Sequence, residues 1–363
     1  MVAIQRARRT KKTTLGQTGL LAATMAAGLS FGAVAAGPSV SAAATPAAAA
    51  AVSQESGCAG VQEKVERLEG RITPNACAFI KRQIAFGEIP TGTPPALGDL
   101  NHPRVKAYLD IFDDESTLWE AGGDPQRGHT AIGDSITRSL QFAPDLRYRG
   151  TSVVADGAVM MFGQQNEVTI KGHKVTFPQI ARNVLSDDGK TIQARRYYDR
   201  YELVKPIAPE LRPLFKGIAD ANPSTRRGTG GAPERFRADE ITARLAAWNN
   251  GDVSALAGRM GNARLTAPGL SRPLSTNAGK TAYLKRFFDH ADVQLKAGQV
   301  AFGGTTTYVE WHGTVTSEKG ADVPFGIVER FGPGGEWELS FDTLPLIADK
   351  DQIGKLFQRL TQP

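Results

Sequence analysis

The chain has 363 residues, of which 43 are basic and 37 acidic, so its formal net charge is +6. Five basic residues and no acidic ones lie before Ala43, and the chain beyond Ala43 is nearly neutral, with 38 basic and 37 acidic residues. A near-neutral chain gives no basis for a nucleic-acid partner or for adsorption to an anionic membrane.

The N-terminal segment has the order of a secretory signal peptide. A basic stretch from Arg6 to Lys12 precedes an apolar stretch from Leu15 to Ala36, and small residues follow up to Ala43. Polar and glycine residues dilute the apolar stretch, so we expect no integral membrane span. We predict a signal peptide over 1–43, a secreted or extracytoplasmic protein, and a disordered Ala-rich spacer over 44–57. Thr-Lys-Lys after the Arg pair favours Sec export over the twin-arginine route.

The two cysteines, Cys58 and Cys77, both lie in the exported part of the chain. An isolated pair in an oxidising compartment predicts one disulfide, although two unpaired thiols are the alternative. Apolar residues recur at helical spacing before and after Pro74. Residues 58–103 are therefore predicted to form a disulfide-stapled helical hairpin followed by a linker.

The rest of the chain reads as helices followed by antiparallel strands, twice over, which predicts an α+β fold. The first set has helices at 105–118 and 131–140 and strands at 146–154, 158–170, 174–185 and 191–203. After a Pro- and Gly-rich linker at 206–234, the second set has helices at 240–257 and 279–290 and strands at 292–302, 305–316, 322–331 and 336–344.

The two sets share the spacing of two carboxylates. Glu167 and Asp199 are 32 residues apart, and so are Glu310 and Asp342. We interpret this as a duplicated domain. The predicted divisions after residue 103 are a first domain at 104–205, the linker at 206–234, a second domain at 235–348 and a C-terminal helix or tail at 349–363.

Two groups of residues resemble a known family. Arg127-Gly128-His129-Thr130-Ala131-Ile132 and Arg195-Arg196-Tyr197-Tyr198-Asp199 resemble the SnoaL-like, limonene-epoxide-hydrolase-like branch of the NTF2-like superfamily. The resemblance implies two cone-shaped α+β barrels, each a curved antiparallel sheet around helices, with a small apolar molecule inside. It also implies that the two domains pack as an intramolecular pseudo-dimer. Gln165 and Arg196 stand where that branch has Arg and Asp.

The last strand of the first set carries the candidate chemistry. Alternation places Arg195, Tyr197 and Asp199 on one face, and Glu167 on a neighbouring strand can meet Asp199. Two carboxylates in a partly dry pocket repel, so one keeps its proton and the two can act as acid and base. Asp199, Glu167 and Tyr197 are thus the predicted catalytic residues. The alternative is a Glu167–Arg195 ion pair, with Asp199 capping the strand end.

The predicted binding residues are Trp119, Glu120, Arg195 and Phe177, with packing as the alternative role for the two aromatic ones. No histidine has metal-ligand spacing, and no nucleotide or serine-hydrolase motif is present, so we predict neither a metal nor a cofactor. Two hypotheses follow. One is a cofactor-independent isomerase, dehydratase, cyclase or epoxide hydrolase, and the other is a non-catalytic module for an apolar ligand or a protein partner.

Overall fold

The computed structural model describes residues 58, 60–222, 236–318 and 322–361. The expected signal peptide and spacer lie outside these residues, as do positions 223–234 of the expected linker. We call residues 58–222 the first half and residues 236–361 the second half. The described chain is mixed α+β with two sheets, one of seven strands and one of five.

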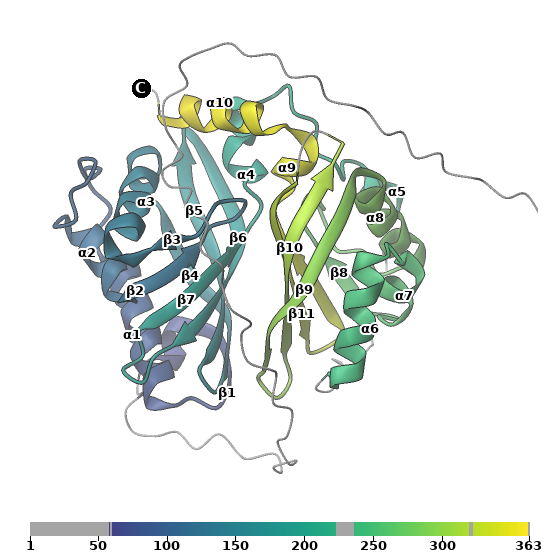
Figure 1. Ribbon diagram of the computed structural model, residues 1–363, viewed down its shortest axis with the longest axis horizontal. Coiled ribbons are helices and arrows are strands. Elements are labelled where there is room, and N and C mark those ends of the chain that lie inside the picture. Colours follow the sequence, from purple (N-terminus) through teal and green to yellow (C-terminus); the bar gives the residue numbers. More distant parts are fainter. Residues whose placement is uncertain (1–57, 59, 223–235, 319–321, 362–363) are drawn as a thin grey trace, which may run out of the picture. The chain divides into compact units, whose positions relative to one another are not determined.

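In the first half, three helices cover one face of a seven-stranded sheet (Figure 1), and a continuous apolar core fills the space between them. The strand order is β1-β4-β5-β6-β7-β2-β3. The elements are η2 (Gln62–Lys64), β1 (Val65–Gly70), α1 (Pro74–Glu88), α2 (Pro103–Asp110), β2 (Phe112–Trp119), β3 (Gln126–Arg127), α3 (Gly128–Phe142), β4 (Arg147–Asp156), β5 (Val159–Ile170), β6 (His173–Leu185), β7 (Thr191–Tyr197), α4 (Tyr201–Val204), η3 (Lys205–Ile207) and α5 (Ile218–Ala221).

Two predicted helices of the first half are wrong. The first arm of the predicted hairpin is strand β1, which pairs in parallel with β4 from Val65 to Gly70. The predicted helix at 105–118 stops at Asp110, and β2 continues beside β7. In both places pairing with a distant strand overrides the local helical spacing.

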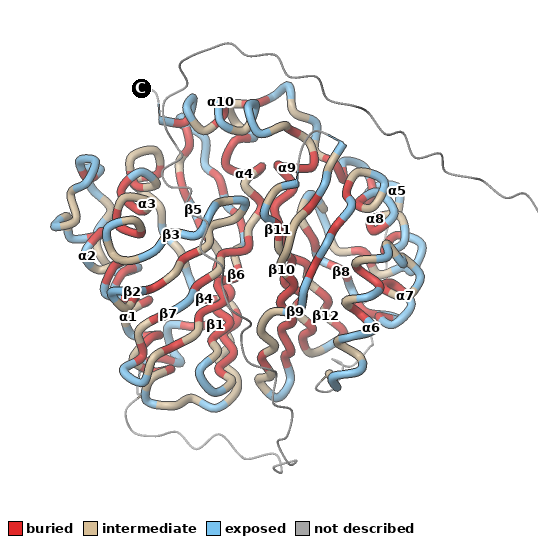
Figure 2. Tube along the Cα trace, in the orientation of Figure 1, coloured by how far each residue is buried: buried red, intermediate tan, exposed pale blue. Residues whose placement is uncertain are grey.

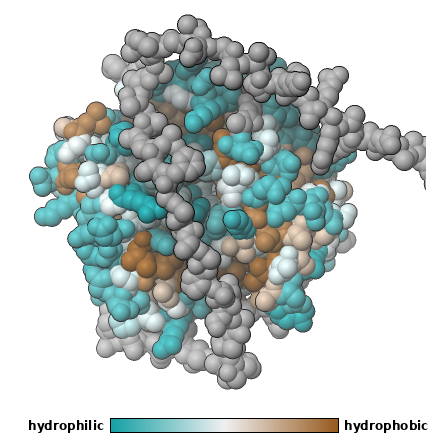
Figure 3. Space-filling model, in the orientation of Figure 1, coloured by the Kyte–Doolittle hydropathy of each residue, from teal (hydrophilic) through white to brown (hydrophobic). Residues whose placement is uncertain are grey.

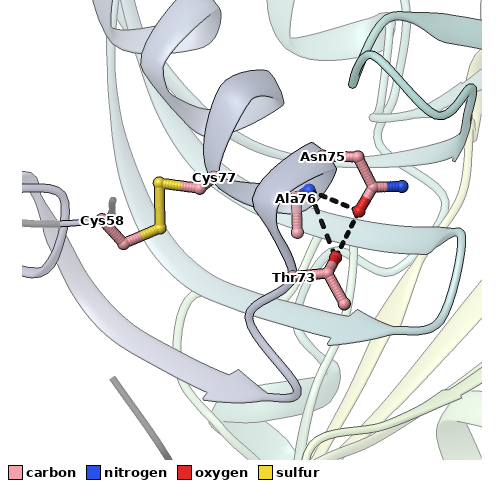
Figure 4. Close-up of a disulfide and its surroundings, with 5 residues drawn as sticks. All are labelled: Cys58, Thr73, Asn75, Ala76 and Cys77. Carbon is pink, nitrogen blue, oxygen red and sulfur yellow. Dashed lines mark hydrogen bonds between the residues drawn. A yellow bond between two sulfur atoms is a disulfide. The ribbon is translucent and has the colours of Figure 1, made fainter. Parts of the chain in front are cut away.

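The predicted disulfide is present. Cys58 and Cys77 are joined and have Cα atoms 5.6 Å apart (Figure 4), so the bond ties the segment before β1 to the first turn of α1. That turn begins at Thr73, whose hydroxyl accepts a hydrogen bond of 3.4 Å from the Ala76 amide. Pro74 occupies the first helical position, where the missing N–H costs nothing.

In the second half, helices α6 to α8 cover one face of a five-stranded sheet with the order β8-β12-β11-β10-β9 (Figure 1). The predicted helix at 240–257 is two helices, because Gly251 adopts a φ of 62° and Asp252 caps a new helix through the Ala255 amide. The elements are α6 (Ala238–Asn249), α7 (Val253–Gly258), β8 (Arg264–Thr266), α8 (Asn277–His290), β9 (Ala291–Phe302), β10 (Thr307–Ser317), β11 (Val323–Gly332), β12 (Glu336–Ser340), α9 (Leu344–Ile347) and α10 (Lys350–Thr361).

The two sheets contact each other through the faces that their helices leave uncovered. Met161, Ile180 and Tyr197 of the first sheet form one buried apolar cluster with Tyr308 and other residues of the second. The Tyr308 hydroxyl donates a hydrogen bond of 3.1 Å to the Ser152 carbonyl. Strands of both sheets are therefore buried on both faces along much of their length (Figure 2).

Among the described residues, no helix is long and apolar enough to cross a membrane. On the face seen in Figure 3, hydrophobic residues gather at several places among hydrophilic ones.

Candidate functional site

Strand β7 places successive side chains on opposite faces of the first sheet, and the two faces have different surroundings. Arg196 pairs with Ala181 of the helix-covered core, and its guanidinium lies 6.0 Å from the centre of the Phe112 ring. Arg195 and Tyr197 point the other way, because Tyr197 pairs with Ile180 of the inter-sheet cluster. The interior of the first half thus receives Arg196, whereas the contact between the sheets receives Arg195 and Tyr197.

A polar group lies at the helix-covered side of the first sheet, where β2 ends. The Tyr198 hydroxyl donates a hydrogen bond of 3.3 Å to the Glu120 carboxylate. The Arg196 guanidinium interacts with both Glu120 and the Tyr108 hydroxyl. The Tyr198 ring is 5.7 Å from the Phe177 ring, which gives the group an apolar wall. We call Tyr108, Glu120, Arg196 and Tyr198 the Glu120 site.

The electrostatics of the Glu120 site suit proton transfer. Burial raises the pKa of Glu120, although the Arg196 charge, the Tyr198 hydrogen bond and the Arg200 charge oppose that rise. Burial and the Glu120 charge raise the pKa of Tyr198 well above its ordinary value, so the phenol keeps its proton and remains a donor. A carboxyl group with a raised pKa beside a fixed phenol donor has the features of a general acid/base.

A second carboxylate, Glu310, sits in the contact between the sheets and is fully engaged. It accepts hydrogen bonds from Arg182 Nε (3.1 Å), the Gln299 amide (2.8 Å) and the Tyr197 hydroxyl. Burial alone would raise the pKa of Glu310, but these partners together hold the pKa below its ordinary value. Glu310 is therefore a buried anion that joins the two sheets.

Asp199 and Asp342 form a symmetric contact between the halves, which we call the Asp clasp. The Asp199 carboxylate accepts from the amides of Tyr201 (3.1 Å) and Thr343 (3.0 Å). The Asp342 carboxylate accepts from the amides of Leu344 and Arg200, both at 3.1 Å. Each aspartate thus binds the amide two residues after itself and the amide one residue after its counterpart.

The pKa of Asp199 in the Asp clasp is raised, whereas that of Glu310 is lowered. Burial, and then the neighbouring Asp342 charge, raise the pKa of Asp199 to about 7. The Asp199–Glu167 carboxylate pair expected from the sequence is not formed, because Asp199 lies beside Asp342 and Glu167 is exposed. The hydrogen bond to the Tyr201 amide matches the alternative capping role of Asp199.

The structure separates the other predicted site residues. Glu167 is exposed, and the ion-pair partner of Arg195 is Glu310, at 3.8 Å. Trp119 lies under the Arg195 guanidinium, 4.4 Å from it, away from the Glu120 site. Of the seven predicted catalytic and binding residues, only Glu120 and Phe177 lie at the Glu120 site, Phe177 as its apolar wall.

The strand register also changes the meaning of the equal spacing. In the first sheet, Tyr197 of β7 pairs with Ile180 of β6, and Ile180 pairs with Gly163 of β5. In the second sheet, Ser340 of β12 pairs with Val328 of β11, and Val328 pairs with Glu310 of β10. Tyr197 and Ser340 each stand two residues before their aspartate. Relative to the clasp, the counterpart of Glu310 is therefore Gly163, and Glu167 is four residues further along β5.

The interior of the second half holds a carboxylate with a full set of partners. Glu329 is completely buried and accepts from Arg244 Nε (2.7 Å) and from the indole N–H groups of Trp248 (2.8 Å), Trp311 (2.8 Å) and Trp337 (2.9 Å). Burial alone would raise the pKa of Glu329, but Arg244 and the indoles hold it below its ordinary value. Large side chains and a satisfied anion therefore fill this interior.

Two hollows lie outside both interiors. A groove of about 480 Å³ is lined by residues of both sheets, among them Arg67, Ser152, Gln165 and Arg330. The Ser152 hydroxyl there is buried without a hydrogen-bond partner. A second hollow of about 540 Å³ lies beside α6 and Met260. Within the described ranges, no three histidine, cysteine or acidic side chains come close enough to hold a metal ion.

Sequence reasoning missed Arg196, Tyr198 and Tyr108 because it assigned the wrong face of β7 to the interior. Both faces of the strand are buried, so alternation alone does not distinguish them. Ala194 could have indicated the inward face of β7, because a small apolar residue between Gln193 and Arg195 suits a packed core. Arg196 and Tyr198 share its face.

No protein-family model matches the sequence, and no curated protein does. Several solved structures are similar to about a third of the chain. One is TerC with polyporic acid, at 14% identity, with 37% of this chain and 97% of that chain covered and a TM-score of 0.31. A putative SnoaL-like polyketide cyclase of Jannaschia sp. CCS1 shows 13% identity and a TM-score of 0.28, with 38% of this chain and 93% of that chain covered. The epoxide hydrolase/cyclase-like enzyme SalBIII shows 15% identity and a TM-score of 0.28, with 35% of this chain and 92% of that chain covered.

Proposed function

We propose that the protein is a cofactor-independent acid/base enzyme whose site is the Glu120 site of the first half. The observation that carries this proposal is the contrast between two interior carboxyl groups. Glu329 in the second half accepts two hydrogen bonds from Arg244 and one from each of three indoles, whereas Glu120 accepts one long hydrogen bond, from Tyr198. A carboxyl group with few partners and a raised pKa is available for proton transfer, and a saturated one is not.

The residues around Glu120 define the chemistry. Glu120 takes a proton from carbon or from water, and Tyr198 or Tyr108 donates a hydrogen bond to the oxygen that gains charge. Arg196 balances the added negative charge. Phe177 and Phe112 provide apolar contact, so a small, largely apolar carbonyl compound or epoxide is the matching substrate class. Isomerisation, dehydration, cyclisation and epoxide opening all need these elements.

The test uses 5-nitrobenzisoxazole, an apolar probe for a carboxylate base. Glu120 removes the proton on carbon 3, the C–H electron pair forms the nitrile, the N–O bond breaks, and 2-cyano-4-nitrophenolate is released. General base catalysis typically contributes about two to four orders of magnitude in rate. We therefore expect Glu120→Gln to lower turnover at least about 100-fold. Glu115→Gln, at an exposed carboxylate of the same strand, is the matched control. Equal turnover in the two variants would contradict the proposal.

We further propose that the chain is an exported, duplicated member of the NTF2-like superfamily, with domains at 104–205 and 235–348 that form an intramolecular pseudo-dimer. The reciprocal hydrogen bonds of the Asp clasp support this proposal, because a two-fold contact joins the same pair of positions in both directions. The disulfide and the N-terminal signal sequence support export. Detection of the mature chain outside the cytoplasm, with a new N-terminus after residue 35 or 43, tests export.

A non-catalytic binding module is the second candidate function. The inter-sheet groove favours it, since its volume is within the range of ligand pockets and the buried Ser152 hydroxyl has no protein partner. A polar ligand held in this groove would protect Tyr308 and Ser152 amides from hydrogen exchange. Protection there, together with unchanged turnover in Glu120→Gln, would favour this function over the enzyme.

A further inference from the structure

The second half anchors a charged side chain of the first half, Arg200, next to the turn that carries Glu120. Arg200, directly after Asp199, donates its backbone N–H and its Nε to Asp342, at 3.1 and 2.7 Å. Its side chain is only 13% exposed. The Arg200 guanidinium also lies 5.7 Å from the Phe357 ring of helix α10. Two elements of the second half therefore fix one arginine of the first half.

The anchored guanidinium packs against the turn that carries Glu120. A Cβ atom added at Gly122 would lie 2.0 Å from an Arg200 terminal nitrogen, so the guanidinium occupies the space that any other residue would fill. Gly122 also has a φ of 62°, which favours glycine. The Gly123 amide donates to the Glu120 carbonyl at 3.0 Å, which keeps the turn tight. Arg200 is thus placed where its charge acts on the Glu120 carboxyl group.

We infer that Asp342 of the second half is a positioning residue for the Glu120 site, because it holds Arg200 beside Glu120 and so completes a site that the first half alone leaves unfinished. The inference rests on the proposed function of that site. It assigns a task to the half whose own interior is filled by Glu329 and three tryptophans. Substitution of Asp342 is therefore expected to change the acid/base properties of a residue in the other half.

The test measures the pKa of the Glu120 carboxyl group by ¹³C NMR on the full-length protein without ligand, with the signal assigned by its loss in Glu120→Gln. Arg200→Gln removes a positive neighbour, so the pKa of Glu120 should rise by about one unit. Asp342→Asn removes the ionic anchor that holds the Arg200 guanidinium in place, so the pKa of Glu120 should rise in this variant too. Loss of the Asp342 charge without displacement of Arg200 would instead lower the pKa of Glu120.

Other variants separate position from charge. Gly122→Ala keeps every charge but displaces the guanidinium, so it should raise the pKa of Glu120 as Arg200→Gln does, and it replaces that variant if Arg200→Gln does not fold. Arg200→Lys keeps the charge and should leave the pKa near the wild-type value. Asp292→Asn, at an exposed carboxylate of β9, is the control for charge removal in the second half.

Each failure has its own signature. A fall or an absent shift of the Glu120 pKa in Asp342→Asn overturns the inference, even if the 5-nitrobenzisoxazole reaction succeeds. A rise in both Arg200→Gln and Asp342→Asn without any turnover supports the positioning role and contradicts the proposed enzyme.

Discussion

Asp199→Asn should change how the stability of the protein depends on pH. Burial and the Asp342 charge raise the pKa of Asp199 from 3.8 to about 7. Between these values the folded state holds a proton that the unfolded chain releases, so stability falls as pH rises through this window and is level above it. A difference of about three pKa units corresponds to about 4 kcal/mol, which is an upper limit for a coupled pair.

Asparagine cannot ionise, yet it keeps an oxygen that can accept from the Tyr201 and Thr343 amides. The free energy of unfolding of Asp199→Asn, relative to wild type, should therefore rise by about 2 to 4 kcal/mol between pH 4 and pH 7. Urea unfolding at several pH values, followed by tryptophan fluorescence, measures this difference.

Glu167→Gln is the control for this experiment, because Glu167 is exposed in the same half. Its stability should run parallel to wild type across the pH range. If the difference between Asp199→Asn and wild type is constant from pH 4 to pH 8, the raised pKa of Asp199 is wrong. If Glu167→Gln reproduces the effect of Asp199→Asn, the carboxylate pair is the one expected from the sequence.

Three further predictions concern stability. Glu329→Gln leaves the buried Arg244 charge without a counter-ion and should cost about 3 to 5 kcal/mol in urea unfolding, whereas the exposed control Glu63→Gln should cost almost nothing. Tyr197→Phe removes a hydrogen bond to the Glu310 carboxylate and should lower the free energy of unfolding by about 1.5 to 3 kcal/mol. Tyr308→Phe, the control, removes a hydrogen bond to a neutral carbonyl. If Tyr197→Phe destabilises the protein less than Tyr308→Phe does, the role given to Glu310 is wrong. Cys58→Ser opens a loop of about 20 residues and should cost about 3 kcal/mol, and wild type treated with reductant should lose the same amount unless the thiols were already free.

Most of the long strands were predictable from the sequence. The helix-to-strand changes were not, nor were the ends of the predicted strands 191–203 and 336–344, where helices α4 and α9 begin instead. Strands β5, β6, β9, β10 and β11 begin and end within two residues of the predicted limits, because glycine and polar turns bound each apolar run. The error at β2 has a physical cause. Phe112 and Leu118 are buried against the core while Asp113 to Glu115 are not, and this uneven pattern fits a helix as well as an irregular strand. Only the pairing with β7, about 80 residues away, decides between them.

The candidate site was harder to predict because of the second sheet. A sheet with one solvated face would leave Arg195, Tyr197 and Asp199 in water, and their polarity would then mark the outside. Here the second sheet buries that face, where Tyr197 binds Glu310 and Asp199 binds Thr343. The polarity of these residues therefore predicts the lining of a pocket, whereas they form part of the contact between the two sheets. Sequence spacing singled out Asp199 and Asp342, but it placed Asp199 in a pocket with Glu167 and could not show that the two aspartates meet.

The asymmetry between the halves follows from this same contact. Each half has a carboxyl group on the helix-covered side of its sheet, completely buried for Glu329 and half-buried for Glu120. In the second half, Glu329 is locked by Arg244 and three indoles, which stabilises the fold and leaves no carboxylate oxygen for a substrate. In the first half, Glu120 keeps a single hydrogen bond, while its electrostatic setting depends on Arg200 and hence on Asp342. Free oxygens on Glu120 are useful only if the local charge is fixed, and the filled second half is the rigid element that fixes it.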